Sequence, residues 1–309
     1  MSVAFVFPGQ GSQVLGMGET FLQEFPEAAH VMDEGEKVTG IPIKKLCLEG
    51  PMEELTKTAN LQPCLTAVEI ICFLAAREKG IEPKAVAGHS LGEYPALFAA
   101  GVMDLRDVLK IVHIRGRLMD EAATARPGAM AAALGVQRDD LEKMLAPLQD
   151  KGVIAIANHN SPEQIVVTGE KILVDDFCKL AKKKKVKAIP LKVSGAYHSP
   201  LMKEAQTKFA SAISNISFNP PKVPIYSNVT AEPETDPERI RELLSMQICS
   251  PVRWYETVKN MQRDGISTFM ELGPKNILTN LIKKSLSEDS FEAFPAGSPE
   301  DFQANAKFF

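Results

Sequence analysis

The five residues 88–92 (GHSLG) constrain the fold of this chain more than any other segment does. They form a G-x-S-x-G pattern around Ser90, after an apolar run at 84–87 and before a helical pattern at 96–103. A turn this tight leaves no room for a Cβ on either side of the serine, because it would collide with the neighbouring strand or helix. The pattern predicts a nucleophilic Ser90 at a helix N-terminus, where backbone N–H groups and the helix dipole stabilise developing negative charge. The alternative is a serine that caps a helix between two ordinary glycines.

Strands and helices are predicted to alternate through the first 124 residues. Val3–Phe7 is a short apolar run that ends in Pro8-Gly9, and helical spacing extends over 60–79 with Gly80 behind it. A strand is expected at 84–87, followed by helices at 96–103 and 105–123. This order favours an α/β fold with a mainly parallel, buried sheet and helices on both faces.

The segment 125–193 has a different order of elements. Strands are expected at 128–136, 153–158, 164–168 and 187–193, helices at 139–148 and 172–182, and a turn at 160–162. The resulting order, β-α-β-β-α-β, is the ferredoxin-like arrangement. We therefore expect a ferredoxin-like domain at 125–193, inserted into a large domain that consists of residues 1–124 and 194–309.

Charge and cysteine content exclude several classes of function. The 309 residues include 35 Lys and Arg against 39 Asp and Glu, a formal net charge of −4, so no global basic field favours nucleic acid. The five cysteines have no zinc-site spacing and are expected to be buried thiols in a reducing compartment. The N-terminus lacks a signal-peptide pattern, and no run approaches the ~18 uncharged apolar residues of a membrane span. We expect a soluble, cytoplasmic protein that binds no nucleic acid, no membrane and no metal.

A nucleophilic Ser90 needs a base, because a free hydroxyl is a weak nucleophile at neutral pH. Among five histidines, His198 lies in a loop of small residues directly after the expected return to the large domain. Such loops often carry function, so His198 is the leading candidate, with a surface-loop histidine as the alternative. Spacing alone leaves the other four open, which are His30, His89, His113 and His159.

Seven motifs, in matching order over nearly the whole chain, resemble the malonyl-CoA:acyl carrier protein transacylases. They are FPGQGSQ at 7–13, GHSLGEY at 88–94, RGRLM at 115–119, NSP at 160–162, HSPLM at 198–202, Gln247 with PVRW at 251–254, and ELGP at 271–274. Seven motifs in register are far more specific than any one of them. The resemblance implies an α/β-hydrolase-like domain with a ferredoxin-like insert, the layout that the strand pattern also predicts.

The resemblance also implies the catalytic residues. Ser90 matches the acylated serine, and His198 matches the histidine that activates it. Gln10 and Leu91 match the residues whose backbone N–H groups form the oxyanion hole. The family assigns no Asp or Glu as a third member of the triad, which separates it from ordinary α/β-hydrolases.

Four further positions match the family's substrate pocket. Arg115 matches the arginine that pairs with the free carboxylate of malonate, and Met119 matches a residue that lines that pocket one turn later. Asn160 and Gln247 match pocket residues, and a main-chain carbonyl at 247 is expected to hold the histidine ring. The other explanation of Arg115 is a surface arginine that pairs along its helix with an acidic side chain at position 120 or 121.

The activity that the resemblance implies is malonyl transfer from coenzyme A to the phosphopantetheine thiol of acyl carrier protein, through a malonyl-serine, for fatty acid biosynthesis. The expected partners are malonyl-CoA and acyl carrier protein, with no cofactor besides the thioester substrate, and the family suggests a monomer. A trans-acting polyketide acyltransferase, a serine esterase or thioesterase, and a non-catalytic acyl-binding module are the alternatives.

Three local features accompany the resemblance. Pro95 lies one turn into the helix that follows Ser90, at a position where the family usually has a small residue. A proline there removes an N–H and could shift the start of this helix. Tyr197 precedes His198, as is also common in malonyl-selecting polyketide acyltransferases. The lysines at 182–185 and Lys187 are interpreted as favourable charge at a helix C-terminus, with a docking patch for an acidic carrier protein or for coenzyme A phosphates as the alternative.

Overall fold

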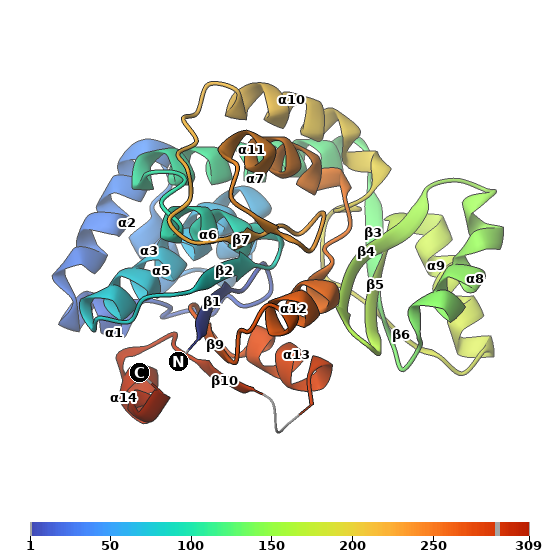
Figure 1. Cartoon of the computed structure of the whole chain (residues 1–309). Helices are drawn as coiled ribbons and strands as arrows, with labels where there is room; N and C mark the ends of the chain where they lie inside the picture. Colours follow the sequence, from blue (N-terminus) through green and yellow to red (C-terminus); the bar gives the residue numbers. More distant parts are fainter. Residues whose placement is uncertain (1, 288–290, 309) are drawn as a thin grey trace.

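A computed structural model describes residues 2–287 and 291–308, and it contains two sheets (Figure 1). The larger sheet has the strand order β10-β9-β1-β2-β7-β8. Its strands are β1 (Val3–Phe7), β2 (Ala85–Gly88), β7 (Ile225–Tyr226), β8 (Pro233–Glu234), β9 (Thr268–Glu271) and β10 (Glu292–Pro295). All neighbouring pairs are parallel except β7 with β8, so the predicted mainly parallel sheet is confirmed.

Helices cover both faces of this sheet (Figure 1). Their bounds are α1 (Glu19–Glu24), α2 (Pro26–Thr39), α3 (Ile43–Leu48), α4 (Met52–Leu55), α5 (Thr58–Glu78), α6 (Glu93–Ala99), α7 (Leu105–Ala125), α10 (Lys203–Ile213), α11 (Pro237–Met246), α12 (Trp254–Arg263), α13 (Ile277–Ser285) and α14 (Pro299–Ala304). β1 lies between β2 and β9, and all five of its residues are buried. A strand covered on both faces needs such a continuous apolar run.

Helix α5 is the core helix of the large body. By length and composition its 21 residues could cross a membrane, with a mean hydropathy of 1.5 in its most apolar window, although the acidic residue Glu69 interrupts its apolar run. Of that window, 83% is buried inside the protein. A core helix that packs against helices on more than one side needs an apolar surface all round, and α5 lies against α2 and α7.

The second sheet is antiparallel, with the strand order β4-β5-β3-β6. It consists of β3 (Gly128–Leu134), β4 (Ile154–Ser161), β5 (Gln164–Glu170) and β6 (Lys187–Pro190), with α8 (Arg138–Gln149) and α9 (Lys171–Lys183). Alternate residues of β3 face opposite ways: Ala131 and Ala133 pack with α8 and α9, whereas Met130 and Ala132 join the core of the large body. This alternation places one face of the second sheet against the large body.

Several predicted bounds in this region are wrong by a few residues. β4 continues to Ser161, so Asn160 and Ser161 lie in the strand and the turn follows at Pro162. Irregular pairing with β5 allows this continuation, because β4 has register shifts beside Asn158 and His159. β6 ends at Pro190, which lacks the N–H that would continue the ladder, instead of at position 193.

Backbone hydrogen bonds connect the second sheet to the large body near the turn that carries Ser90. Val252 donates its N–H to the carbonyl of Ala157 at 2.8 Å, and its own carbonyl accepts the N–H of His159 at 2.9 Å. These bonds hold β4 against the segment that leads into α12. The second sheet is therefore fixed against the large body at this point.

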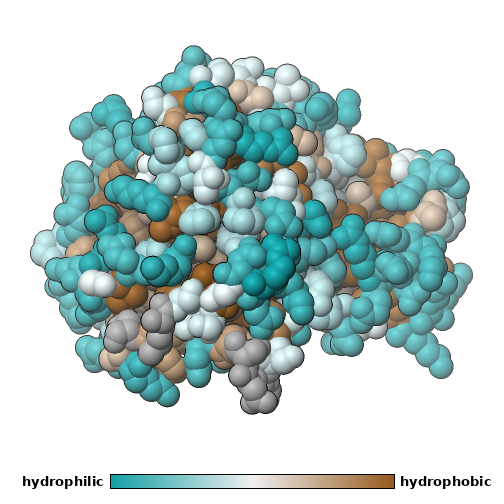
Figure 2. Space-filling model, in the orientation of Figure 1, coloured by the Kyte–Doolittle hydropathy of each residue, from teal (hydrophilic) through white to brown (hydrophobic). Residues whose placement is uncertain are grey.

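The surface, the cysteines and the lysine run bear on the expectations of buried thiols and of charge at a helix C-terminus. Most of the face in Figure 2 is hydrophilic, including the lobe that contains α8 and α9. Cys47, Cys64 and Cys72 are buried free thiols, as expected, but Cys178 and Cys249 are only half-buried. The lysines at 182–185 are exposed at the end of α9, which agrees with their interpretation as charge at a helix C-terminus.

Candidate active site

The turn that carries Ser90 is possible only because two glycines flank it. A Cβ on Gly88 would lie 1.9 Å from the backbone carbonyl carbon of Gly92, and a Cβ on Gly92 would lie 2.0 Å from the carbonyl oxygen of Phe7. Both obstacles are backbone atoms that cannot rotate away. Ser90 itself adopts a φ of 53°, a left-handed conformation that places its side chain outside the sheet. The predicted strand–serine–helix turn is confirmed.

The helix after the turn starts earlier than predicted. A short 3-10 turn at Ser90–Gly92 leads into α6, which begins at Glu93 instead of 96 and ends at Ala99. Gly101 follows with a φ of 77°, which stops the helix before position 103. Pro95 lies in the first turn of α6, where a backbone N–H has no partner within the helix. The proline is therefore accommodated without disturbing Ser90.

Asn228, from a distant part of the sequence, stabilises this strained turn by two hydrogen bonds. Its side-chain oxygen accepts the N–H of Ser90 at 2.7 Å, and its amide donates to the carbonyl of Gly88 at 2.6 Å. One amide therefore satisfies a donor and an acceptor that the sharp turn removes from the sheet. Sequence reasoning missed Asn228, because it lies 138 residues from Ser90 in the chain.

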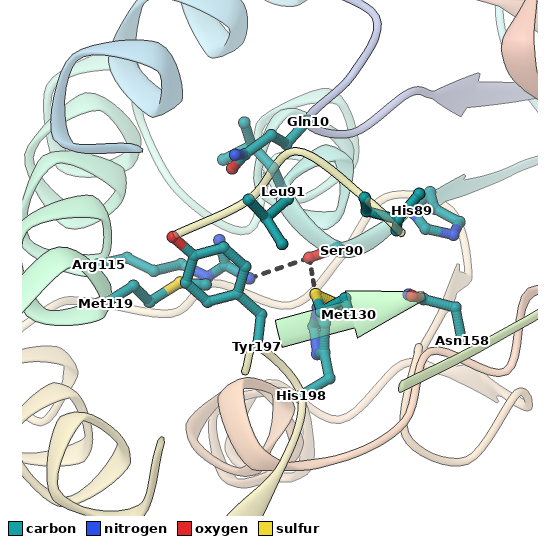
Figure 3. A pocket seen from close by; sticks show the side chains of 12 residues that line it. Gln10, His89, Ser90, Leu91, Arg115, Met119, Met130, Asn158, Tyr197 and His198 are labelled. Carbon is teal, nitrogen blue, oxygen red and sulfur yellow. Dashed lines mark hydrogen bonds between the residues drawn. The ribbon is translucent and has the colours of Figure 1, made fainter. Parts of the chain in front are cut away.

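Ser90 and His198 are brought together as predicted. The Oγ atom of Ser90 lies 2.8 Å from Nε2 of His198 (Figure 3). The Nδ1 atom of His198 faces two main-chain carbonyl oxygens, of Gln247 at 3.1 Å and of Ser250 at 3.0 Å. No carboxylate is recorded behind the ring among the residues that the structure describes. Burial and then the charge of Arg115 lower the pKa of His198 to about 3, so the ring is a neutral base at physiological pH.

The other histidines are held elsewhere. The Nε2 atom of His89 contacts the side-chain oxygen of Asn160 at 2.8 Å, and Nδ1 of His159 contacts Glu256 at 3.2 Å. His30 is exposed on α2, and His113 is on α7. Of the five histidines, only His198 has a recorded contact with the hydroxyl of Ser90.

Arg115 is a buried residue of the site and not a surface cation. Its side chain projects from α7 with the residue 1% exposed, and Nη2 donates to Ser90 Oγ at 3.1 Å and to Gln247 Oε1 at 2.9 Å. Its guanidinium also lies 5.2 Å from the ring centre of Tyr94, which adds a cation–π contact. The surface-pair explanation is wrong, since Asp120 accepts the N–H of Ala59 and Glu121 pairs with Arg117.

These side chains border a cavity of about 120 Å³ (Figure 3). Its lining comes from α7, from β3 and β4 of the second sheet, and from loops and turns of the chain: Gln10, His89, Ser90, Leu91, Arg115, Met119, Met130, Asn158, Leu191, Val193, Tyr197 and His198. Sequence reasoning missed three apolar lining residues: Met130, for which the alternation along β3 was the only signal, and Leu191 and Val193, which follow the end of β6.

Some of the predicted site residues line the cavity and others lie outside it. Gln10, Leu91 and Met119 line the cavity. Asn160 does not line it: it is buried, and its oxygen holds the ring of His89, while Asn158, two residues earlier in β4, takes the lining position. Gln247 does not line it either, because it lies fully buried behind Arg115. Among residues 2–287 and 291–308, no group of three or more His, Cys, Asp or Glu side chains could hold a metal ion.

A half-buried serine on a strand–turn–helix elbow, a buried histidine at hydrogen-bond distance from it and an arginine beside the hydroxyl form the arrangement of a serine-dependent acyl-transfer domain. The family model described as "Acyl transferase domain" matches residues 4–306. The malonyl CoA-acyl carrier protein transacylase of Bacillus subtilis is 41% identical over 284 residues, which are 91% of this chain and 90% of that protein. The chain therefore belongs to the malonyl CoA-acyl carrier protein transacylase family.

Solved structures agree with this assignment. The malonyl-CoA:acyl carrier protein transacylase (FabD) of Xanthomonas oryzae pv. oryzae superimposes with a TM-score of 0.96 at 36% identity, covering 100% of this chain and 98% of that one. A type II polyketide acyl-carrier protein in complex with its malonyl-transacylase, PlMCAT:AntF, gives 0.95 at 35% identity over 100% of both chains. The α/β fold of this protein is thus the fold of these enzymes.

Proposed function

We propose that the protein transfers a malonyl group from coenzyme A to the phosphopantetheine thiol of acyl carrier protein, through a malonyl ester of Ser90, in fatty acid biosynthesis. The observation that carries this proposal is the position of Arg115, a buried guanidinium 3.1 Å from the hydroxyl of Ser90. A three-carbon acyl group on that oxygen brings its free carboxylate next to the guanidinium. A planar guanidinium can meet both carboxylate oxygens at once.

The first half-reaction makes the acyl-enzyme. His198 Nε2 takes the proton of Ser90 as Oγ attacks the thioester carbonyl, and the backbone N–H groups of Gln10 and Leu91 stabilise the oxyanion. Both residues line the cavity, and Leu91 lies in the first turn of a helix, where N–H groups lack helical partners. Collapse of the intermediate breaks the C–S bond, and His198 returns the proton to the departing coenzyme A thiol.

The second half-reaction runs in the reverse direction with a different thiol. The phosphopantetheine thiol gives its proton to His198 and attacks the ester carbonyl, and the C–O bond to Ser90 breaks as the hydroxyl regains a proton. No metal and no cofactor besides the thioester takes part. The PlMCAT:AntF complex, a carrier protein together with its malonyl-transacylase, supports an acyl carrier protein as the partner.

The hydrolase alternative has less support. An esterase with this elbow has an Asp or Glu behind the histidine, whereas His198 faces the carbonyl oxygens of Gln247 and Ser250. A trans-acting polyketide acyltransferase has the same chemistry, and the PlMCAT:AntF likeness keeps it as the second candidate.

The finer structural and cellular assignments are also proposals. The strand order β4-β5-β3-β6 supports a ferredoxin-like insert at 125–193, and the parallel sheet with its elbow supports a hydrolase-like large domain at 1–124 and 194–309. Three buried free thiols and the buried α5 support a soluble, cytoplasmic protein. We further propose that it acts as a monomer, as the family resemblance suggests.

The test is the mass of the protein after mixing with malonyl-CoA. The wild-type chain is expected to gain one malonyl group on Ser90 and to lose it when holo-acyl carrier protein is added. Ser90→Ala should gain none while unfolding at the same denaturant concentration, whereas Ser211→Ala, on the exposed face of α10, should be acylated normally. A wild-type chain without a malonyl adduct, or a folded Ser90→Ala chain with full transfer, rules out this mechanism.

A further inference from the structure

Glu93 is a buried carboxylate beside the nucleophile that the reaction steps above do not use. It is the first residue of α6 and 5% exposed. One carboxylate oxygen accepts the N–H of Asn228 at 3.4 Å, and the other accepts the side-chain N–H of Gln247. Burial raises the pKa of this carboxyl to about 7, against the opposing effects of these two hydrogen bonds and of the charge of Arg115.

Gln247 is the junction through which Glu93 reaches the rest of the site. Its side-chain oxygen accepts from Arg115 at 2.9 Å, and its side-chain nitrogen also donates to the carbonyl of Ser90 at 2.9 Å. Its main-chain carbonyl meanwhile accepts from His198 at 3.1 Å. One residue therefore contacts the nucleophile, the base and the arginine.

The orientation of the Gln247 amide follows from the chemistry of its neighbours. An ionised carboxylate can only accept hydrogen bonds and a guanidinium can only donate them. Because Arg115 can only donate, the oxygen of Gln247 must face it, which leaves the NH₂ group for two acceptors, the carbonyl of Ser90 and the carboxyl of Glu93. If the amide turned over, its NH₂ group would meet the donors of Arg115 and its oxygen would meet the acceptors of Glu93.

We infer that Glu93 is a positioning residue for acyl-group selection: it fixes the Gln247 amide so that Arg115 is held toward Ser90, where the carboxylate of a malonyl group would lie. This inference rests on the proposed function. Glu93 contacts neither Arg115 nor the reacting atoms directly in the recorded hydrogen bonds. Its effect should therefore appear in the choice between acyl groups and not in the chemistry that all acyl groups share.

Glu93→Gln is the first test, because it preserves size but turns one acceptor into a donor. The new NH₂ group must face either the N–H of Asn228 or the amide of Gln247, so one buried donor loses its acceptor. We expect the ratio of malonyl-CoA to acetyl-CoA acylation rates to fall about 10- to 100-fold, the range for an unsatisfied buried polar group. Acylation by acetyl-CoA, which has no carboxylate to place, should change much less.

A second variant and a double variant separate positioning from folding. Gln247→Met removes the amide but keeps the main-chain carbonyl that holds His198, and it should lower the same ratio. In an Arg115→Ala background, Glu93→Gln should leave the ratio unchanged, because the group that it positions is absent. Glu271→Gln is the matched control: Glu271 is a buried carboxylate that accepts two backbone N–H groups, from Leu278 and Thr279, without contact to Arg115. It should lower stability and leave the ratio as in the wild type.

The outcomes are distinct. Equal loss of both acyl donors in Glu93→Gln and Gln247→Met, or a further fall of the ratio in the Arg115→Ala background, overturns the positioning role and leaves the proposed function intact. A wild-type chain that accepts no malonyl group removes the proposed function itself, and the positioning role with it. A lowered ratio in both single variants, absent from the double variant and from Glu271→Gln, supports the inference.

Discussion

The Nδ1 atom of His198 donates to the main-chain carbonyl of Gln247 at 3.1 Å, and the carbonyl of Ser250 lies 3.0 Å from the same nitrogen. A carbonyl oxygen can only accept, so the proton must be on Nδ1 and the lone pair of Nε2 faces the hydroxyl of Ser90. The carbonyl thus fixes the tautomer that a base requires, the task that an aspartate performs in a serine–histidine–aspartate triad. Because this partner is part of the backbone, substitution of the side chain at 247 leaves it in place.

Removal of the base should slow acylation without abolishing binding. His198→Ala is expected to reduce the rate of malonyl-adduct formation by about 10²–10⁴-fold, the range for a positioned general base. His159→Ala, which removes another buried histidine but one that contacts Glu256, should have a much smaller effect. The check is the adduct mass at timed intervals after mixing, and a larger defect in His159→Ala would contradict the assignment of the base.

His198 should also make the fold sensitive to acid. Its pKa is lowered from the ordinary 6.5 to about 3 in the folded chain, so below pH 6.5 the unfolded chain takes up a proton that the folded chain does not. Folding stability should therefore fall as the pH drops from about 6.5 toward 3, by at most about 1.4 kcal/mol per pH unit from this residue. Denaturant unfolding of wild type and His198→Gln at pH 7.5, 5.5 and 4.5 measures the difference, and identical losses in both would contradict it.

The elbow glycines should tolerate no side chain. Gly92→Ala places a Cβ 2.0 Å from the carbonyl oxygen of Phe7, a backbone atom of the central strand. We expect a loss of more than about 3 kcal/mol of unfolding free energy, or failure to fold, because neither strand nor helix can move away. Gly35→Ala is the control: the one close contact of its Cβ would be the terminal methyl of Ile43, which can rotate, the Leu109 methyls lie at ordinary distance, and α2 gains helix propensity. Comparable losses in the two variants would contradict this explanation.

Local sequence signals predicted the parts of the site that depend on local structure. The turn between a buried strand and a helix requires glycine at both ends for steric reasons, and this requirement can be recognised in the five residues alone. Ser90 is where it was expected. Periodicity likewise located β1 and α7, because one buried run and one apolar stripe suffice to define them.

The contacts that organise the site connect distant segments, and periodicity does not report them. Asn228 contacts Ser90 over 138 residues and Gln247 contacts Glu93 over 154. Each is a polar residue whose partner becomes apparent only after the chain has folded. Asn160 is a similar case: its side chain contacts the ring of His89, 71 residues away, and Asn158 lines the cavity instead.

The carboxylate of the acyl group should account for most of the selectivity. Arg115→Ala removes the buried cation that faces Ser90, and loss of one member of a buried charge pair costs about 2–5 kcal/mol. Acylation by malonyl-CoA should therefore fall roughly 30-fold to several thousand-fold. Acetyl-CoA has no carboxylate to pair, and because the charge of Arg115 lowers the pKa of His198, its removal should leave acetyl transfer unchanged or improved.

Two further variants distinguish recognition of the carboxylate from general support of the site. Arg115→Lys keeps the charge but offers a single ammonium where the guanidinium donates to Gln247 and Ser90 together, so it should recover only part of the malonyl rate. Arg117→Ala, on the exposed side of the same helix and paired with Glu121, should leave both acyl donors unaffected. The measurement is the initial rate of adduct formation with each coenzyme A ester. If Arg115→Ala lost both esters equally, the arginine would act in folding or in coenzyme A binding, since only a contact to the carboxylate separates malonyl from acetyl.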